Sequence, residues 1–188
     1  MTKNIHEIRD PIHVFVRLYS DERPVLDSRP FQRLRHIHQL AMTYLVYPGA
    51  THRRFEHSLG TMELASRVYD IVTRPENLTE RVRDILPDLL DDYKRQYWRR
   101  VLRAAALCHD IGHLPFSHAA EKDLLPNGWN HERLSAEIIG SKELAPIWKD
   151  MKITSDDVVK VALGPKEAKK VNFSPLEAIL AEIIVGDA

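Results

Sequence analysis

The stretch that most constrains the fold runs from residue 101 to residue 118 and reads VLRAAALCHDIGHLPFSH. Its first half is almost entirely apolar, which predicts a helix that is buried over most of its surface. This helix ends at His109 and Asp110. Burying a carboxylate beside an imidazole is costly unless the pair is hydrogen-bonded or binds a cation. The stretch therefore predicts a divalent-metal site at the end of a buried helix.

The residues after Asp110 keep further imidazoles near this predicted site. Gly112 allows a sharp turn of the backbone and Pro115 stops a helix from continuing, so that His113 and His118 are free to face the same cavity. The alternative is a helix end with scattered, solvated histidines. Three histidines and one aspartate within ten positions of an apolar helix favour the functional interpretation.

The composition limits the class of protein. The chain has 188 residues, of which 44% are hydrophobic, and this suffices for one core, so we expect a single domain over residues 1–188. With 27 basic and 27 acidic residues, no overall charge attracts the protein to nucleic acid or to an anionic membrane. The first ten residues carry no apolar run of the kind expected in a leader, and no stretch is long and apolar enough to predict a membrane helix. The one cysteine, Cys108, is expected to be a packed thiol. We therefore expect a cytoplasmic protein.

Local patterns predict a mainly all-α fold. Alternating residues over 11–19 predict a short strand or hairpin arm, within an N-terminal arm or hairpin that occupies residues 1–28. The polar run over 74–97, which contains Pro75 and Pro87, is expected to be a connector or a peripheral helix. Besides the buried helix, helical spacing and capping residues predict helices over about 27–40, 51–73, 118–125, from 131 onward, 153–163 and 175–185.

A further candidate ligand, His57, lies on another predicted helix, in RRFEHSLG. An isolated histidine in such a place is more often a satisfied core residue than a ligand. With His109 and Asp110, however, it would complete a set of nitrogen and oxygen donors that suits iron, manganese, zinc or magnesium. A metal held in this way can activate water and polarise a phosphoryl oxygen, which are the two tasks of a metal in a phosphoester hydrolase. Other imidazoles would remain for protons and phosphate charge, namely His113, His118 and His131.

The motifs RFEHSLG, CHDIGHLPFSH and WNHE resemble those of the HD-domain phosphohydrolases. The segments FQRLRHIHQL and YPGATHRRFEHS narrow the resemblance to the deoxynucleoside triphosphate triphosphohydrolase (dNTPase) branch, over about residues 9–140. The resemblance implies an HD-domain helical bundle, a nucleotide substrate, and assembly into a homo-oligomer, either a dimer or a tetramer. It also implies that the metal ligands are His57, His109 and Asp110.

The resemblance further assigns residues to the substrate. It implies that His113, His118 and His131 line the phosphate site and that His118 gives a proton to the leaving 5′-oxygen. The carboxylate that would orient His118 is Glu121, where the family carries Asp. The remaining matches are Arg54 for phosphate, Gln39 with Leu40 for the deoxyribose, and Asp27, Gln32 and Arg35 for an activating guanine nucleotide between subunits.

These assignments have simpler alternatives. Arg54 lies one helical turn before His57, and Gln39 can both donate and accept, so both suit their implied roles, but either could belong to a solvated helix face. The three activator residues could be a helix cap and a polar face.

The resemblance also sets an expectation for the end of the chain. The family completes its metal site with an Asp in a motif resembling Asp-Arg-x-Asp-Tyr, which follows a helix whose end resembles LAEIIVGDA. In this chain Asp187 is nearby, but the alignment places that ligand a few residues beyond Ala188, together with further substrate contacts. We therefore expect a piece of a longer protein that binds metal weakly and hydrolyses little.

Three functions remain open from the sequence. The leading one is hydrolysis of a dNTP to the deoxynucleoside and triphosphate. A second is hydrolysis of another nucleotide, such as a nucleoside monophosphate, a cyclic dinucleotide or an alarmone, and a third is a catalytically incomplete nucleotide-binding or assembly module. Nucleic-acid binding through Arg33, Arg35, Arg53 and Arg54 lacks the interleaved aromatic residues that would support it.

Overall fold

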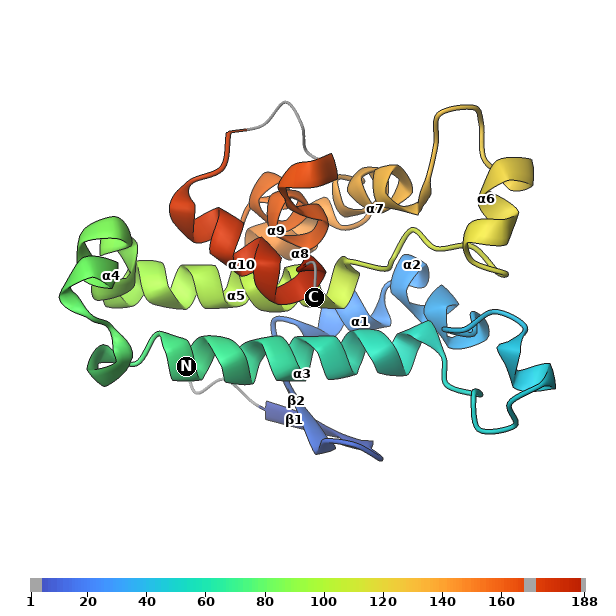
Figure 1. Ribbon diagram of the computed structural model, residues 1–188, viewed down its shortest axis with the longest axis horizontal. Coiled ribbons are helices and arrows are strands. Elements are labelled where there is room, and N and C mark those ends of the chain that lie inside the picture. The colour runs from blue at the N-terminus through green and yellow to red at the C-terminus, as the bar shows by residue number, and fades with distance from the viewer. Residues whose placement is uncertain (1–4, 168–171, 187–188) are drawn as a thin grey trace.

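The computed structural model describes residues 5–167 and 172–186, and Asp187 lies outside them (Figure 1). The described chain is mainly helical and begins with a two-stranded antiparallel hairpin, which confirms the predicted fold class. The elements are β1 (Ile5–Asp10), β2 (Val14–Tyr19), α1 (Arg23–Asp27), α2 (Arg29–Gln32), η1 (Arg33–His36), η2 (Thr43–Leu45), α3 (Arg54–Val72), η3 (Pro75–Asn77), α4 (Glu80–Ile85), η4 (Pro87–Leu90), α5 (Asp92–Cys108), α6 (His118–Leu124), α7 (His131–Ile139), α8 (Ala145–Met151), α9 (Ser155–Glu167) and α10 (Pro175–Val185).

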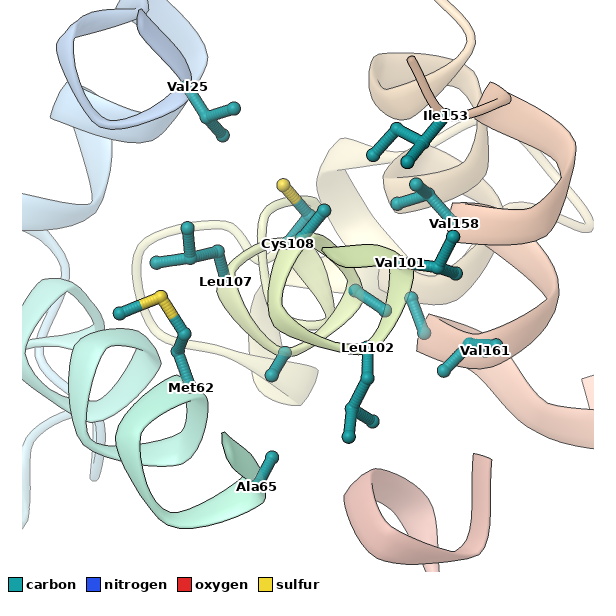
Figure 2. Close-up of a cluster of buried hydrophobic side chains, with 14 of the residues drawn as sticks. Val25, Met62, Ala65, Val101, Leu102, Leu107, Cys108, Ile153, Val158 and Val161 are labelled. Carbon is teal, nitrogen blue, oxygen red and sulfur yellow. The ribbon is translucent and has the colours of Figure 1, made fainter. Parts of the chain in front are cut away.

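Helix α5 is the centre of the fold. It lies beside α3 on one side and against α9 and α10 on the other (Figure 1). Figure 2 looks along α5 and shows Leu107 directed toward Met62 of α3, and Val101 directed toward Val158 and Val161 of α9. Every residue from 101 to 108 is buried, so the prediction of a buried helix is confirmed for this half of α5. Burial also raises the pKa of Cys108 to about 12, which agrees with a packed thiol.

One charged side chain, Arg103, lies inside this apolar half of α5 and is 2% exposed. Its guanidinium donates to both carboxylate oxygens of Glu22, at 2.5 and 2.8 Å, and to the Arg17 carbonyl at 2.7 Å. It also donates to Ser66 Oγ at 2.5 Å. Arg103 therefore links α5 to the end of the hairpin and to α3. The sequence analysis treated this half of α5 as apolar and missed the ion pair.

The predicted N-terminal hairpin is present, but the sequence analysis located only its second strand. Strand β1 pairs with β2 in a register that runs from Ile5 opposite Tyr19 to Asp10 opposite Val14. The predicted strand over 11–19 begins too early, because residues 11–13 form the turn. Asp10 Oδ1 accepts from the backbone amides of Ile12 and His13 and closes this turn.

The predicted helix over 27–40 is wrong beyond His36. The chain forms the short helices α1, α2 and η1 and then becomes extended. His38 forms a bridge with Arg53, so these residues pair with the segment before α3 and not with their own preceding turn. Leu40 follows in a turn and is 47% exposed.

The other predicted helices are present with small shifts. Helix α3 begins at Arg54, three residues later than expected, and α6 and α7 begin where predicted, with Asn130 accepting from the Arg133 amide as the cap of α7. Helices α9 and α10 are also found, and Ser174 with Glu177 forms the predicted capping box. The region 74–97 contains α4 and two short 3-10 helices, and α5 already begins within it at Asp92. Among the described residues, every helix is too short or too polar to cross a membrane.

Replacing Arg103 with Met should lower the free energy of unfolding by about 3–5 kcal/mol, because it leaves the Glu22 carboxylate buried without its cation. Urea denaturation measures the loss. Arg23→Met is the control, since Arg23 makes an exposed pair with Asp27 and should cost at most about 1 kcal/mol. Equal losses in the two variants would contradict a stabilising role for the buried pair.

Candidate metal and phosphate site

Two helices bring the predicted metal ligands together. His57 lies in the first turn of α3, and His109 and Asp110 directly follow α5. The two helices run side by side in opposite directions, so the start of α3 meets the end of α5 (Figure 1). Residues that are 52 and 53 positions apart in the sequence therefore share one site.

The donor atoms of these three residues lie within 4.8 Å of one another. His57 Nε2 is 3.2 Å from His109 Nε2, and the Asp110 carboxylate oxygens lie 3.7 Å from the first nitrogen and 3.6 Å from the second. Metal–nitrogen bonds of about 2.0–2.1 Å place neighbouring ligand atoms roughly 3 to 3.4 Å apart, so small rotations complete the coordination sphere. The donor set therefore fits a divalent cation.

Local contacts prepare His109 and His57 for ligation. His109 Nδ1 is 2.8 Å from the Ala106 carbonyl, which can only accept, so this nitrogen carries the proton and Nε2 faces the site with a lone pair. Burial, with the nearby His109, lowers the pKa of His57 to about 4. This imidazole is therefore neutral at pH 7, as a metal ligand must be.

The Asp110 carboxylate is ionised although it is 9% exposed. Burial would raise its pKa, but the hydrogen bond with His113 and the neighbouring His109 and Arg54 hold this pKa well below its ordinary value. Arg54 Nη1 donates to Asp110 Oδ2, and Gln39 Nε2 lies 3.4 Å from the same oxygen. Asp110 is therefore both a candidate ligand and the anchor of two candidate substrate residues.

A second group lies beside the first. Glu121 Oε1 is 3.0 Å from His118 Nδ1 and 2.9 Å from His131 Nδ1, and the His131 ring stacks on His113 with centroids 3.9 Å apart. Burial would raise the pKa of Glu121, but the contacts with His131 and His118 lower it. The structure thus brings together the three histidines expected at the phosphate and Glu121, which was expected to orient His118. The expected contact between His118 and Glu121 is present, and Glu121 holds His131 as well.

Arg54 and Gln39 carry unpaired polar atoms at this site. Arg54 is 3% exposed and its Nη2 donates to Ser117 Oγ at 2.9 Å, but its buried Nε has no hydrogen-bond partner among the described residues. The buried Oε1 of Gln39 also lacks one. Such atoms are costly unless a ligand or water pairs with them. Neither residue therefore belongs to a solvated helix face.

The three residues expected at an activating nucleotide do not converge on one another. Arg35 Nε donates to Gln32 Oε1 at 2.8 Å, and Gln32 Nε2 donates to the Leu26 carbonyl at 2.7 Å. Asp27 instead pairs with Arg23 at 3.1 Å. Within one chain, two of the three are in contact and the third faces another partner.

Gly112 has a different role from the one predicted. A Cβ on this residue would lie 2.2 Å from the His131 carbonyl oxygen and 2.4 Å from the Ser135 amide nitrogen. Positive φ angles occur instead at Phe116 and Ser117. Gly112 therefore allows close approach of the turn to α7, where its amide donates to Ser135 Oγ at 2.9 Å.

The sequence analysis missed the role of two other residues here. Arg33 was considered only as a nucleic-acid contact, but its guanidinium donates to the carbonyls of Ile111 and His113. Ser135 Oγ donates to the His109 carbonyl at 3.2 Å. Neither role has a local sequence signal, because both contacts join segments that are far apart in the chain.

Comparisons with known proteins find relatives of this chain. Residues 54–182 match the family model described as HD domain. The deoxynucleoside triphosphate triphosphohydrolase SAMHD1 of Gallus gallus is 38% identical over 135 residues, which make up 69% of this chain and 20% of the chicken protein. Human SAMHD1 is 33% identical over 175 residues, which make up 86% of this chain and 26% of the human protein.

Two further relatives have no stated function. An uncharacterised protein of Methanocaldococcus jannaschii is 42% identical over 125 residues, which make up 66% of this chain and 22% of that protein. The crystal structure of a hypothetical protein from Aquifex aeolicus superposes with a TM-score of 0.68 at 33% identity, covering 98% of this chain and 42% of that chain. The chain therefore spans about a fifth to a quarter of the length of these curated relatives.

Gly112→Ala should lower the free energy of unfolding by about 1–3 kcal/mol and weaken Mn²⁺ binding, because the new methyl group would push the turn away from the α7 backbone. Urea denaturation and a Mn²⁺ titration measure the two effects. Gly49→Ala is the matched control, since a Cβ there meets nothing within 4 Å. If Gly112→Ala behaves like Gly49→Ala, the close approach is not required.

The metal-free protein should lose stability as the pH falls from about 6.5 to about 4. The pKa of His57 is about 4 in the folded protein and about 6.5 in an unfolded chain, so only the unfolded chain takes up a proton in this range. The contribution of neutral His57 is thus complete above this range and is lost within it. Melting temperatures measured in the presence of chelator should depend less steeply on pH in His57→Gln than in the unmodified protein. Burial also lowers the pKa of His113, so some dependence should remain. Identical profiles would contradict the assignment to His57.

Proposed function

The chain belongs to the HD domain family of phosphohydrolases, and on that basis we propose that it hydrolyses a dNTP to the deoxynucleoside and triphosphate. The observation that carries this proposal is the convergence of His57, His109 and Asp110 beside a second cluster of imidazoles. The SAMHD1 relatives are named as deoxynucleoside triphosphate triphosphohydrolases, which favours this substrate class over others.

The metal would be held by His57, His109 and Asp110, with iron, manganese, zinc and magnesium all compatible with these donors. A divalent cation bound there would supply Lewis-acid polarisation of a phosphoryl oxygen and an acidified water. Arg54 lies against the same carboxylate and one turn before His57, so its guanidinium would bind a phosphate oxygen next to the metal. Its unpaired Nε is available for this contact.

The second cluster would serve the leaving group. Water attacks the α-phosphorus, the bond from phosphorus to the 5′-oxygen breaks, and that oxygen takes up a proton. His118 is our proposed donor, because its side chain is 72% exposed at the mouth of the site and Glu121 fixes its Nδ1. His113 and His131, which stack on each other, would donate hydrogen bonds to the phosphates.

The proposed sugar contact rests on Gln39 with Leu40. The amide nitrogen of Gln39 lies toward Asp110, so its unpaired Oε1 is left to accept a hydrogen bond. A sugar hydroxyl would supply the missing donor. This feature favours a nucleoside-containing substrate over inorganic polyphosphate.

Two other parts of the proposal depend on the family. We propose that the protein acts as a dimer or tetramer, with Asp27, Gln32 and Arg35 at a nucleotide site between subunits. The second candidate function is a nucleotide-binding module without turnover. The observation that favours it is that Arg54 Nε and Gln39 Oε1 have no hydrogen-bond partner among the described residues. A bound nucleotide would supply these partners.

With Mn²⁺, the protein should release triphosphate and deoxyguanosine from dGTP at a low rate, as the expectation of weak metal binding implies, and chelator should abolish the reaction. His57→Gln and His109→Gln should each lower the rate by about 100-fold or more, because each removes a ligand from the centre. Ion chromatography of triphosphate measures the rate. His36→Gln is the control, since His36 is exposed and lies outside both clusters.

Other outcomes separate the alternatives. Hydrolysis of a nucleoside monophosphate, a cyclic dinucleotide or an alarmone, with dGTP left intact, would contradict the dNTP assignment and keep the hydrolase. Tight dGTP binding without turnover in the unmodified protein would favour the binding module.

A further inference from the structure

The turn between α5 and α6 carries Asp110 and His113 and leads to His118. Its second half has little apolar burial to hold it, since Pro115 is exposed and Phe116 is 54% exposed. Phe116 has a φ of 68° and Ser117 has a φ of 54° with a ψ of −137°. Residues other than glycine rarely adopt such angles, so contacts from outside the turn must impose this conformation.

Arg33 of η1 contacts the first half of the turn from outside it. Its Nη1 donates to the His113 carbonyl at 2.7 Å and its Nη2 donates to the Ile111 carbonyl. These two acceptors lie on either side of Gly112, so one guanidinium holds the backbone on both sides of the residue that approaches α7. The planar fork of arginine can reach two carbonyls at once, whereas a lysine ammonium is a single point charge.

A second contact fixes the same segment from the α7 side. Ser135 Oγ accepts from the Gly112 amide at 2.9 Å and donates to the His109 carbonyl at 3.2 Å. The turn is therefore held between η1 and α7. The η1 contact is the one made by a charged donor, and such bonds are stronger than those between neutral groups.

We propose that Arg33 is a positioning residue for the metal centre. By fixing the carbonyls of Ile111 and His113, it keeps the Asp110 carboxylate directed at His57 and His109 and keeps the His113 ring against His131. Its guanidinium acts on the backbone and does not touch the substrate. This inference rests on the proposed metal-dependent function, because the geometry it preserves is that of the metal ligands.

The test is to titrate the unmodified protein, Arg33→Gln and Arg33→Lys with Mn²⁺ and to measure the bound metal by electron paramagnetic resonance. Arg33→Gln should bind Mn²⁺ about 10–100-fold more weakly, the effect expected when a residue that orients metal ligands is removed. Arg33→Lys should fall in between, because it keeps the charge and can satisfy one carbonyl. Arg29→Gln is the control and should bind as the unmodified protein does, since Arg29 is exposed on the preceding helix.

Circular dichroism and melting curves confirm that each variant is folded at the temperature of the titration, so a loss of affinity reports the site and not unfolding. If Arg33→Gln does not fold, Arg33→Lys decides. Unchanged Mn²⁺ affinity in the folded Arg33 variants overturns the proposal, and so does a lack of Mn²⁺ binding by the unmodified protein.

The titration also separates this inference from the proposed function. If the unmodified protein binds Mn²⁺ but releases no triphosphate from dGTP, while the Arg33 variants bind more weakly, the positioning role stands and the dNTPase assignment fails. If the protein is active, kcat at saturating Mn²⁺ should fall in the variants more than KM for dGTP rises.

Discussion

The burial of the second half of α5 is the constraint on which the rest of the structure depends. This half is covered by α3 on one side and by α9 on the other, and its three consecutive alanines, residues 104–106, allow these helices to pack closely. The packing fixes the register of α3 against α5. Because each residue of a helix advances it by about 1.5 Å, a slip of two residues would shift His57 by about 3 Å relative to His109, which is more than a metal–nitrogen bond of about 2.0–2.1 Å.

Two buried arginines, Arg103 and Arg54, differ in how completely their guanidinium groups are hydrogen-bonded. Arg103 has its guanidinium hydrogen-bonded to Glu22, Ser66 and a backbone carbonyl, and Nε and both terminal nitrogens have partners. Arg54 is equally buried, yet its Nε has none, and Gln39 beside it also has an unpaired oxygen. A fully satisfied network stabilises one conformation, while a partly satisfied one is costly without a ligand. The difference in pairing therefore marks the region around Arg54 as the place where a polar ligand would bind.

The sequence predicted those features that depend on residues close together in the chain. The long helices follow from apolar spacing and caps, and the candidate ligands His109 and Asp110 follow from their place at the end of an apolar run. Other features depend on contacts between distant parts of the chain, and no local pattern predicts them. These are the location of strand β1, the burial of Arg103 and the contacts of Arg33. Gly112 was predicted only in part. The sequence indicated that a glycine is needed at this turn, but the reason, which is the close approach of the turn to α7, is visible only in the tertiary structure.

Glutamate at position 121, where the resemblance led us to expect aspartate, can also be understood from geometry. The longer side chain reaches back one turn of α6 to His118 and across to His131 at the start of α7, and a single oxygen, Oε1, lies within 3.0 Å of both. One ionised carboxylate thus sets the orientation of two imidazoles on different helices. Glu121 therefore makes the contact that the resemblance led us to expect, and it links the exposed imidazole of His118 to that of His131, which stacks on His113.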